Sequence, residues 1–232
     1  MATVYAVGVG PGDPELLTRK AERILRSVDV ILAPVSNPSE ASVALGTIRE
    51  FIDDSRQEII VHQFPMTSDR ERLTQAWQEA AALIAVHAGA GRSVAFITIG
   101  DPLFYSTFIY LLRILREQWP RIPIEIVPGI SSIFAAASVA ALPLVEADEK
   151  MVVVPATAGI EHIIHALAHY ETVVLLKVKP LFAEILELLR QTGREKSTVF
   201  VERVGSPRQK VLTDFDAIAA HSPDYLSLMI IK

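Results

Sequence analysis

Two glycine-rich turns follow apolar stretches of the sequence, and their residue types would let the backbone approach a ligand. Residues 4–7 are apolar and lead into GVGPGD at residues 8–13, and residues 94–99 lead into Gly100-Asp101-Pro102. Glycine removes the side chain that would otherwise keep a ligand away from the backbone. The free amides of a helix start favour a carboxylate or another anion. Two such turns in one chain indicate a ligand site more strongly than either turn alone.

The first turn lacks the spacing of the familiar nucleotide-binding loops. A dinucleotide loop needs G-x-G-x-x-G and an acidic residue at the end of the second strand. Here the glycines alternate, and Pro34 and Val35 stand where that acid is expected. The turn also lacks the Lys and Ser/Thr of a phosphate-binding P-loop. Taken by itself, this segment is equally well explained as a tight connection between a strand and a helix.

Polar residues near the other turns have two interpretations each. Asp101 either accepts a hydrogen bond from a ligand or caps a helix, and Pro102 suits a first helical position. A third turn follows the strand that ends at Val127, and there Ser131 or Ser132 either caps the next helix or binds a polar ligand. Capping and ligand binding do not exclude each other at these positions.

The composition bounds the kind of protein. Of the 232 residues, 50% are hydrophobic and 21% are charged, so a sizeable core is expected. A net charge of −5 argues against nucleic acid as a bulk partner. The absence of cysteine excludes disulfides and a cysteine nucleophile. With no secretion-signal pattern and no apolar stretch long enough to span a bilayer, we expect a cytoplasmic protein without membrane contact.

Apolar strands alternate with helical patterns along the whole chain, which predicts an α/β fold with mostly parallel strands. The last two strands lack a long intervening helix, so the C-terminal sheet is expected to be mixed. The predicted strands are residues 3–7, 28–33, 58–62, 94–99, 125–127, 151–154, 172–177, 198–201, 209–213 and 226–231. The predicted helices are residues 14–27, 42–51, 70–87, 104–118, 130–141, 159–169, 181–191 and 215–221.

A boundary between two domains is predicted at residues 120–123. Pro120 and Pro123 stop the preceding helix and stiffen a short connector. The sequence thus predicts an N-terminal α/β domain over residues 1–119 and a C-terminal α/β domain over residues 124–232. Ligand sites concentrate in clefts between domains, so we expect the ligand there.

These motifs, taken in order, resemble those of the tetrapyrrole (corrin/porphyrin) methyltransferase family, whose members use S-adenosylmethionine. The resemblance covers essentially the whole chain and rests on GVGPGDPELLT at residues 8–18, GDP at 100–102, PGISS at 128–132 and VERVGSPRQ at 201–209. Residues 100–107 (GDPLFYST) and 225–228 (YLSL) are most similar to the precorrin-2/cobalt-factor II C20-methyltransferases of cobalamin biosynthesis, a branch of porphyrin metabolism. The resemblance implies a class III methyltransferase fold, a cleft that holds the donor, and a homodimer.

The resemblance also assigns donor contacts, mostly through the backbone. Lys177 stands where relatives often have methionine, and Arg203-Val204 where they often have asparagine-glycine, so these positions depart from the pattern. Ile99 replaces a glycine of the uroporphyrinogen methylases, which favours a different member. The implied contacts of S-adenosylmethionine, and of its product S-adenosylhomocysteine, are Pro11, Gly100, Asp101, Phe104, Tyr105, Ser131, Ser132, Lys177 and Val204.

The implied reaction is attack of an electron-rich ring carbon on the methyl group of the sulfonium. Aligning the two bound partners can supply up to about 7–11 kcal/mol of barrier lowering. A base must remove a proton at some stage, and Tyr105 is the candidate because it directly follows the central motif. The carboxylates of precorrin-2 or cobalt-factor II should be bound by positively charged side chains. Each candidate could instead be an ordinary solvated surface residue. The candidate cations are Arg19, Arg113, Arg203 and Arg208.

Other interpretations remain open from the sequence. His162, His165 and His169 recur at helical spacing, but they lack a metalloprotease pattern and a further ligand, so no metal site is predicted. The same donor could serve another ring position, a protein or an RNA. A non-catalytic nucleotide- or tetrapyrrole-binding module would bind ligand without turnover. A dehydrogenase is disfavoured by the glycine spacing.

Overall fold

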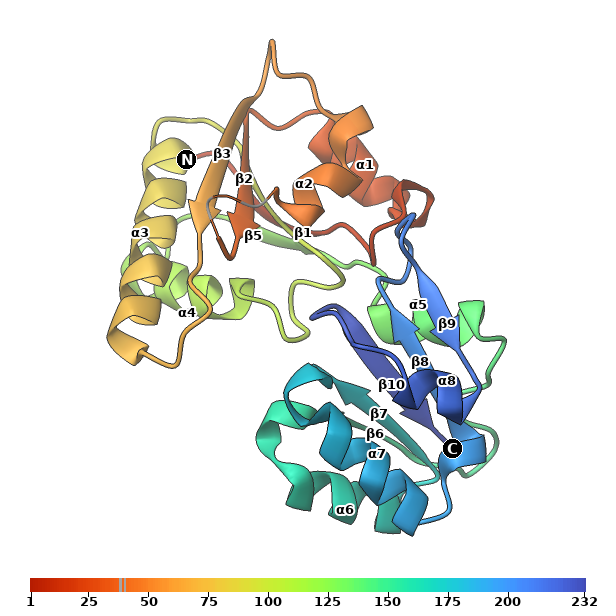
Figure 1. Ribbon diagram of the computed structural model, residues 1–232. Helices are drawn as coiled ribbons and strands as arrows, with labels where there is room; N and C mark the ends of the chain where they lie inside the picture. The colour runs from red at the N-terminus through yellow and green to blue at the C-terminus, as the bar shows by residue number, and fades with distance from the viewer. Residues whose placement is uncertain (38, 40) are drawn as a thin grey trace. The chain divides into compact units, whose positions relative to one another are not determined.

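The computed structural model describes residues 1–37, 39 and 41–232 and divides the chain into two compact units, Met1–Ser131 and Ser132–Lys232 (Figure 1). Each unit is built on its own five-stranded sheet. The two-domain α/β fold predicted from the sequence is therefore confirmed.

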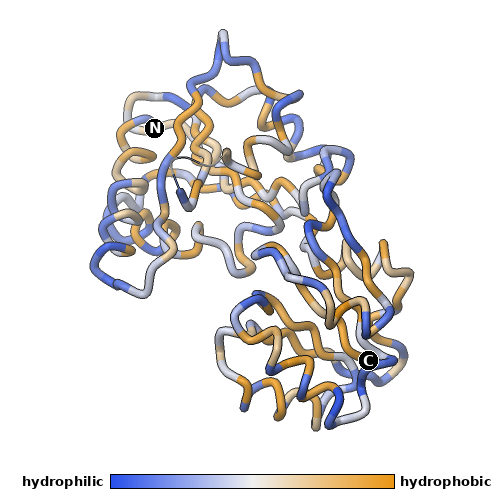
Figure 2. Tube along the Cα trace, in the orientation of Figure 1, coloured by the Kyte–Doolittle hydropathy of each residue, from blue (hydrophilic) through white to orange (hydrophobic). Residues whose placement is uncertain are grey.

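All strands of the first unit run parallel, in the order β3-β2-β4-β1-β5. Buried parallel strands are expected to be almost continuously apolar, and β4 is buried at every residue. The strands are largely apolar along the chain trace as well (Figure 2). Their bounds are Val4–Gly8 for β1, Val30–Val35 for β2, Glu58–Gln63 for β3, Val94–Thr98 for β4 and Ile124–Val127 for β5.

Helices cover both faces of this sheet (Figure 1). Successive side chains of a strand point to opposite faces. Thus Phe96 of β4 packs with helices α3 (Arg70–Gly89) and α4 (Phe108–Gln118), whereas its neighbour Ile97 packs with α1 (Arg19–Leu25) and α2 (Val43–Thr47). The result is a three-layer unit with the sheet in the middle.

Strands β1 and β4 are neighbours, but the chain leaves them in opposite directions. From β1 the chain passes through α1 to β2, on the far side of β4, and from β4 it passes through α4 to β5, on the far side of β1. Open parallel sheets bind ligands at the carboxyl ends of strands where the direction of the connections reverses. This rule points to the carboxyl ends of β1 and β4.

The second unit has a mixed sheet, as predicted, in the order β6-β7-β10-β8-β9. Only β6 and β7 pair in parallel; β10 is antiparallel to both β7 and β8, and β8 is antiparallel to β9. The strands are β6 (Met151–Pro155), β7 (Thr172–Leu176), β8 (Thr198–Glu202), β9 (Lys210–Leu212) and β10 (Ser227–Ile231).

One face of the mixed sheet packs against helices α6 (Ile160–His169), α7 (Phe182–Gln191) and α8 (Phe215–Ala219). Leu175, Phe200 and Met229 lie at the centre of that core and are fully buried. Helix α5 (Ser132–Val139) opens the unit, and it is shorter than the predicted helix 130–141.

The structure corrects the predicted domain boundary. β5 pairs with β1, so residues 120–123 connect α4 to β5 inside the first unit. The two prolines mark an ordinary turn between a helix and a strand, and the division between the units follows Ser131.

Three predicted helices also begin or break differently. The segment 14–27 is a 3-10 turn (Pro14–Leu16) followed by α1, because the Thr18 hydroxyl accepts from the Ala21 amide and caps a new start. The segment 42–51 likewise divides into α2 and a 3-10 turn, Arg49–Phe51. Helix α4 begins only at Phe108, because Tyr105 adopts a left-handed backbone conformation (φ 51°) that ends any helical run.

Candidate functional site

The turns that follow β1 and β4 lie side by side in the first unit. The amide of Gly100 donates a hydrogen bond to the carbonyl of Gly10 (2.8 Å), and the two residues form an isolated antiparallel bridge. Both glycines have positive φ angles, 73° at Gly10 and 70° at Gly100, which side chains disfavour. The two glycine-rich turns are therefore one structure at the carboxyl edge of the sheet.

A third turn joins this structure through a close backbone approach. A Cβ placed on Gly8 would lie 2.6 Å from the amide nitrogen of Gly129, and a Cβ on Gly129 would lie 2.1 Å from the carbonyl oxygen of Gly100. Neither position has room for a side chain. The glycines of the sequence motifs thus let three backbone segments meet, a role that alternation of glycine along the sequence did not reveal.

Asp101 ties two of these turns together. Its Oδ1 accepts from the amide of Leu103 (2.8 Å), and its Oδ2 accepts from the amide of Gly129 (3.1 Å). The predicted capping of α4 by Asp101 is wrong, because that helix begins seven residues later at Phe108. Pro102 is buried in the turn and is not a first helical residue. Each carboxylate oxygen can accept a second hydrogen bond, so Asp101 can still face a ligand.

The segment after Asp101 exposes three large side chains in a row. Leu103, Phe104 and Tyr105 are 51%, 39% and 48% exposed, and the rings of Phe104 and Tyr105 meet edge to face, 4.8 Å between centroids. Below them the buried Ser106 hydroxyl donates to Thr98 Oγ1 (3.1 Å) and accepts from the amide of Phe108 (3.2 Å). We call Leu103, Phe104 and Tyr105 the apolar ledge; its base is anchored while its side chains face solvent.

In the second unit, the predicted residues gather where β7 and β8 end on either side of β10. Lys177 follows β7 and Arg203 follows β8, and both are non-glycine residues with positive φ, 55° and 49°. Val204 is buried beside Arg203. Ser131 is the last residue of the first unit and Ser132 is the first residue of α5 in the second unit, and both are half-buried.

Arg203 is engaged inside the second unit. Its guanidinium forms an ion pair with Asp224, in which Nε donates to Oδ2 at 2.5 Å. Burial alone would raise the pKa of Asp224, but hydrogen bonds from Arg203 and from the Tyr225 amide outweigh it and hold that pKa below its ordinary value. This partner makes Arg203 a weaker candidate for binding substrate carboxylates.

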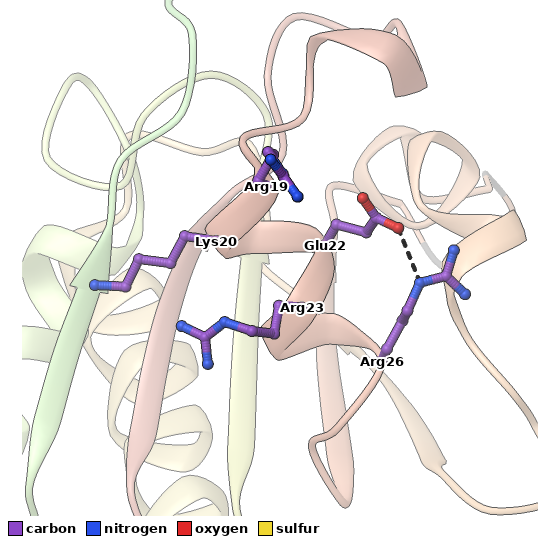
Figure 3. A pocket seen from close by; sticks show the side chains of 5 residues that line it. All are labelled: Arg19, Lys20, Glu22, Arg23 and Arg26. Atoms are coloured by element: carbon purple, nitrogen blue, oxygen red, sulfur yellow. Dashed lines mark hydrogen bonds and ion pairs between the residues drawn. The ribbon is translucent and has the colours of Figure 1, made fainter.

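The other predicted cations lie on the surface. Arg113 is exposed and stands over the ring of Tyr110, which itself stacks on Trp77, and Arg208 is exposed after β8. Arg19 belongs to an open hollow on α1, which Figure 3 shows from close by. Lys20 reaches Glu125 of β5 and Arg26 pairs with Glu22, so part of this positive charge is already neutralised. The hollow is lined by Arg19, Lys20, Glu22, Arg23 and Arg26.

Three histidines lie on the surface of α6, and His62 lies against helix α3. His162, His165 and His169 are exposed on α6. His62 contacts the carbonyl of Ala76 (3.1 Å). Within residues 1–37, 39 and 41–232, no three metal-ligating side chains come together, and no helix is long and apolar enough to cross a membrane.

Sequence reasoning missed a buried polar group next to Arg203. Glu202 is 6% exposed, and its Oε2 accepts from the Asp224 amide (2.6 Å) and lies 3.1 Å from His221 Nε2. The only signal was a carboxylate directly after the apolar residues 199–201 of β8. His221 and Asp224 come from a segment about twenty residues further on, so only the fold brings them to Glu202.

Comparison with known proteins gives consistent matches over nearly the whole chain. A sequence model of the family described as Tetrapyrrole (Corrin/Porphyrin) Methylases matches residues 3–218. The probable cobalt-precorrin-2 C(20)-methyltransferase of Methanocaldococcus jannaschii is 39% identical, over 99% of this chain and 95% of that protein. The cobalt-precorrin-2 C(20)-methyltransferase of Salmonella typhimurium is 36% identical, over 89% and 86%.

A solved structure extends the comparison to the fold. It is the uroporphyrin-III C-methyl transferase of Thermus thermophilus in complex with S-adenyl homocysteine. The two chains align with a TM-score of 0.67 and 25% identity, over 99% of this chain and 92% of the other.

Proposed function

Because the chain belongs to the tetrapyrrole methylase family, we propose that it transfers a methyl group from S-adenosylmethionine to C20 of precorrin-2 or cobalt-factor II in cobalamin biosynthesis. The observation that carries this proposal is the 39% identity to a relative named for that reaction, over nearly the full length of both chains. The two relatives reported above are named for cobalt-precorrin-2, and a Sinorhizobium relative, 32% identical over 98% of this chain, is named for precorrin-2 itself, so both the metallated and the metal-free macrocycle are candidate acceptors.

The residues of the first unit are suited to binding the methyl donor through backbone groups. At Gly100 an added Cβ would meet no atom within 4 Å, so the turn faces open space at the carboxyl edge where such sheets bind ligands. The Asp101 carboxylate keeps acceptor capacity at this edge. The uroporphyrin-III enzyme of similar fold binds the demethylated donor, which supports the same choice of cosubstrate here. The proposed donor contacts are Pro11, Gly100, Asp101, Phe104, Tyr105, Ser131, Ser132, Lys177 and Val204.

The apolar ledge suits the acceptor. Exposed contiguous apolar groups mark binding surfaces, and a flat macrocycle offers a broad apolar face to Leu103, Phe104 and Tyr105. Because Ser106 anchors the ledge from below, little ordering is needed when a ligand binds. Arg19, Arg113 and Arg208 remain the candidates for the substrate carboxylates.

Catalysis of this reaction depends mainly on aligning the bound donor with the bound acceptor. The bound donor supplies a methyl group on a positively charged sulfur. The chain's own contribution is to hold both partners, to exclude water with the ledge, and to take the ring proton. The proposed group is the Tyr105 hydroxyl, whose oxygen accepts the ring proton while its own proton passes to water.

We also propose that the protein pairs as a homodimer and works in the cytoplasm. Phe134 and Val139 on α5 are 59% and 43% exposed, and Val145 shortly after it is 46% exposed, so this segment offers apolar side chains that pairing would cover. Sedimentation equilibrium of the wild type and of Phe134→Glu tests this: a dimer that the substitution converts to monomer supports the pairing, and a monomeric wild type contradicts it.

Calorimetry tests the cosubstrate. S-adenosylhomocysteine should bind and NAD should not. Absence of binding to S-adenosylhomocysteine would remove the basis of the proposal. Binding of both cosubstrate and macrocycle without methyl transfer would favour the second candidate, a non-catalytic tetrapyrrole-binding module.

A further inference from the structure

We propose that Asp224 is a positioning residue for the methyl donor, because its ion pair with Arg203 holds the turn after β8 in a left-handed conformation. The inference rests on the proposed function, in which the backbone at Val204 contacts the donor. Asp224 itself would touch neither the donor nor the macrocycle. It would act through Arg203 on the path of the neighbouring backbone.

The turn after β8 has a backbone that its sequence does not favour. Arg203 has φ 49°, a region that long side chains rarely occupy, and Gly205 follows with φ 77°. Glycine would adopt the Arg203 conformation without penalty. An arginine in this conformation is strained unless interactions outside the turn offset the cost.

Those interactions are present and converge on the Arg203 side chain and backbone. The guanidinium pairs with Asp224 through both Nε and a terminal nitrogen, and the Arg203 amide donates to the carbonyl of Leu226 (2.8 Å). The two side chains of the pair are only 19% and 33% exposed, so solvent screens them less than a surface pair.

Asp224 is itself fixed and can serve as an anchor. Its amide donates to the buried Glu202 carboxylate (2.6 Å), and its carbonyl accepts from the Ser227 hydroxyl (2.6 Å). Its Oδ1 accepts from the Tyr225 amide (2.5 Å). Glu202 is held in turn by His221 on its Oε2. Asp224 is thus connected to the end of β8 and to the start of β10.

The location favours a role in ligand binding. Left-handed non-glycine residues end both β7 and β8, at Lys177 and Arg203, where the sequence resemblance places donor contacts. Strained backbone persists where the surrounding structure enforces it, and it concentrates at binding sites. Here the enforcing group is the carboxylate of Asp224.

Four variants test the inference through the affinity for S-adenosylhomocysteine, measured by calorimetry alongside the melting temperature. Asp224→Asn and Arg203→Gln each break the pair but keep a residue that disfavours the turn, and each should weaken binding about tenfold. Arg203→Gly should bind within about twofold of wild type. The double variant Asp224→Asn/Arg203→Gly should recover that affinity, because glycine needs no tether.

A matched control is Asp54→Asn, which breaks the exposed pair between Arg49 and Asp54 and should leave donor affinity unchanged. In methyl-transfer assays that vary the donor concentration, Asp224→Asn should raise KM for S-adenosylmethionine and keep kcat. Rescue by glycine is the decisive readout, because a merely stabilising ion pair would not be replaced by glycine.

The inference is overturned if folded Asp224→Asn and Arg203→Gln bind S-adenosylhomocysteine like wild type, or if the double variant stays as weak as Asp224→Asn. Failure of the proposed function looks different: wild type itself would then show no affinity for S-adenosylhomocysteine, and the assigned role of Asp224 would fall with it.

Discussion

Gly129 lies against Gly8 so closely that a Cβ on Gly129 would sit 2.8 Å from the Gly8 Cα and 2.1 Å from the carbonyl oxygen of Gly100. The atoms in the way are all backbone and cannot swing aside. Gly129→Ala should therefore push the turns after β1, β4 and β5 apart. We expect a loss of about 1–3 kcal/mol in the free energy of unfolding, measured in urea, and weaker binding of S-adenosylhomocysteine.

Gly46→Ala is the matched control for that substitution. A Cβ on Gly46, inside α2, meets no atom within 4 Å, and alanine is the better helix former. This variant should be neutral or up to about 1 kcal/mol more stable, with unchanged ligand affinity. Equal stability of Gly129→Ala and wild type would contradict the close approach.

Asp101 should matter more than an ordinary turn or cap residue. Asp101→Ala leaves the amides of Leu103 and Gly129 without their acceptor and frees the turn after β5 from the turn after β4. We expect a stability loss of about 1–3 kcal/mol and a large loss of affinity for S-adenosylhomocysteine. Asp69→Ala removes a cap that accepts from two amides of α3, and it should cost about 1 kcal/mol with normal affinity. If both variants bind the ligand normally, Asp101 does not shape the site.

The aromatic ring and the hydroxyl of Tyr105 have separate proposed roles, which two substitutions can distinguish. Tyr105→Phe keeps the ring of the apolar ledge and removes the hydroxyl. If the hydroxyl relays the ring proton to water, kcat should fall about 10²–10⁴-fold in Tyr105→Phe while the affinity for the macrocycle is retained. Tyr105→Ala should weaken macrocycle binding as well, measured by the change in macrocycle absorbance. A full rate of methyl transfer by Tyr105→Phe would end the role of Tyr105 as base.

Lowering the pH should weaken the Arg203–Asp224 ion pair over a defined pH range. Because the folded state lowers the pKa of Asp224, the pair contributes stability above the unfolded pKa of about 3.9, and the contribution is lost as the pH falls through the lower folded pKa. The difference in melting temperature between wild type and Asp224→Asn should thus be constant near neutral pH and shrink below about pH 4. A difference that does not change on acidification would mean that the carboxylate charge is not what stabilises the turn.

Local sequence predicted most of the elements, because apolar runs and helical periodicity come directly from burial. It failed where single residues changed the backbone. Tyr105 in a left-handed conformation delays α4, and the Thr18 cap breaks the first helix. The proline-rich connector looked like a domain boundary because proline stops a helix whether or not a domain ends there. Only the pairing of β5 with β1 shows that it does not.

The candidate site was predictable only as a set of motifs. The resemblance identified the turns at Gly100 and Val204, since their residue types are local. It did not identify the contacts that hold those turns. The bond from Asp101 to Gly129 and the link from Glu202 to His221 and Asp224 join segments that are distant in sequence, so only the fold could reveal them.

The central claim is methyl transfer to one carbon of one macrocycle. The purified protein should be incubated anaerobically with S-adenosylmethionine carrying a ¹³C-labelled methyl group, once with precorrin-2 and once with cobalt-factor II. The account predicts a product heavier by one methyl group from at least one of the two macrocycles, with NMR placing the ¹³C label at C20. A label at another ring position, or no methyl transfer to either macrocycle by a folded protein that binds S-adenosylhomocysteine, would contradict it.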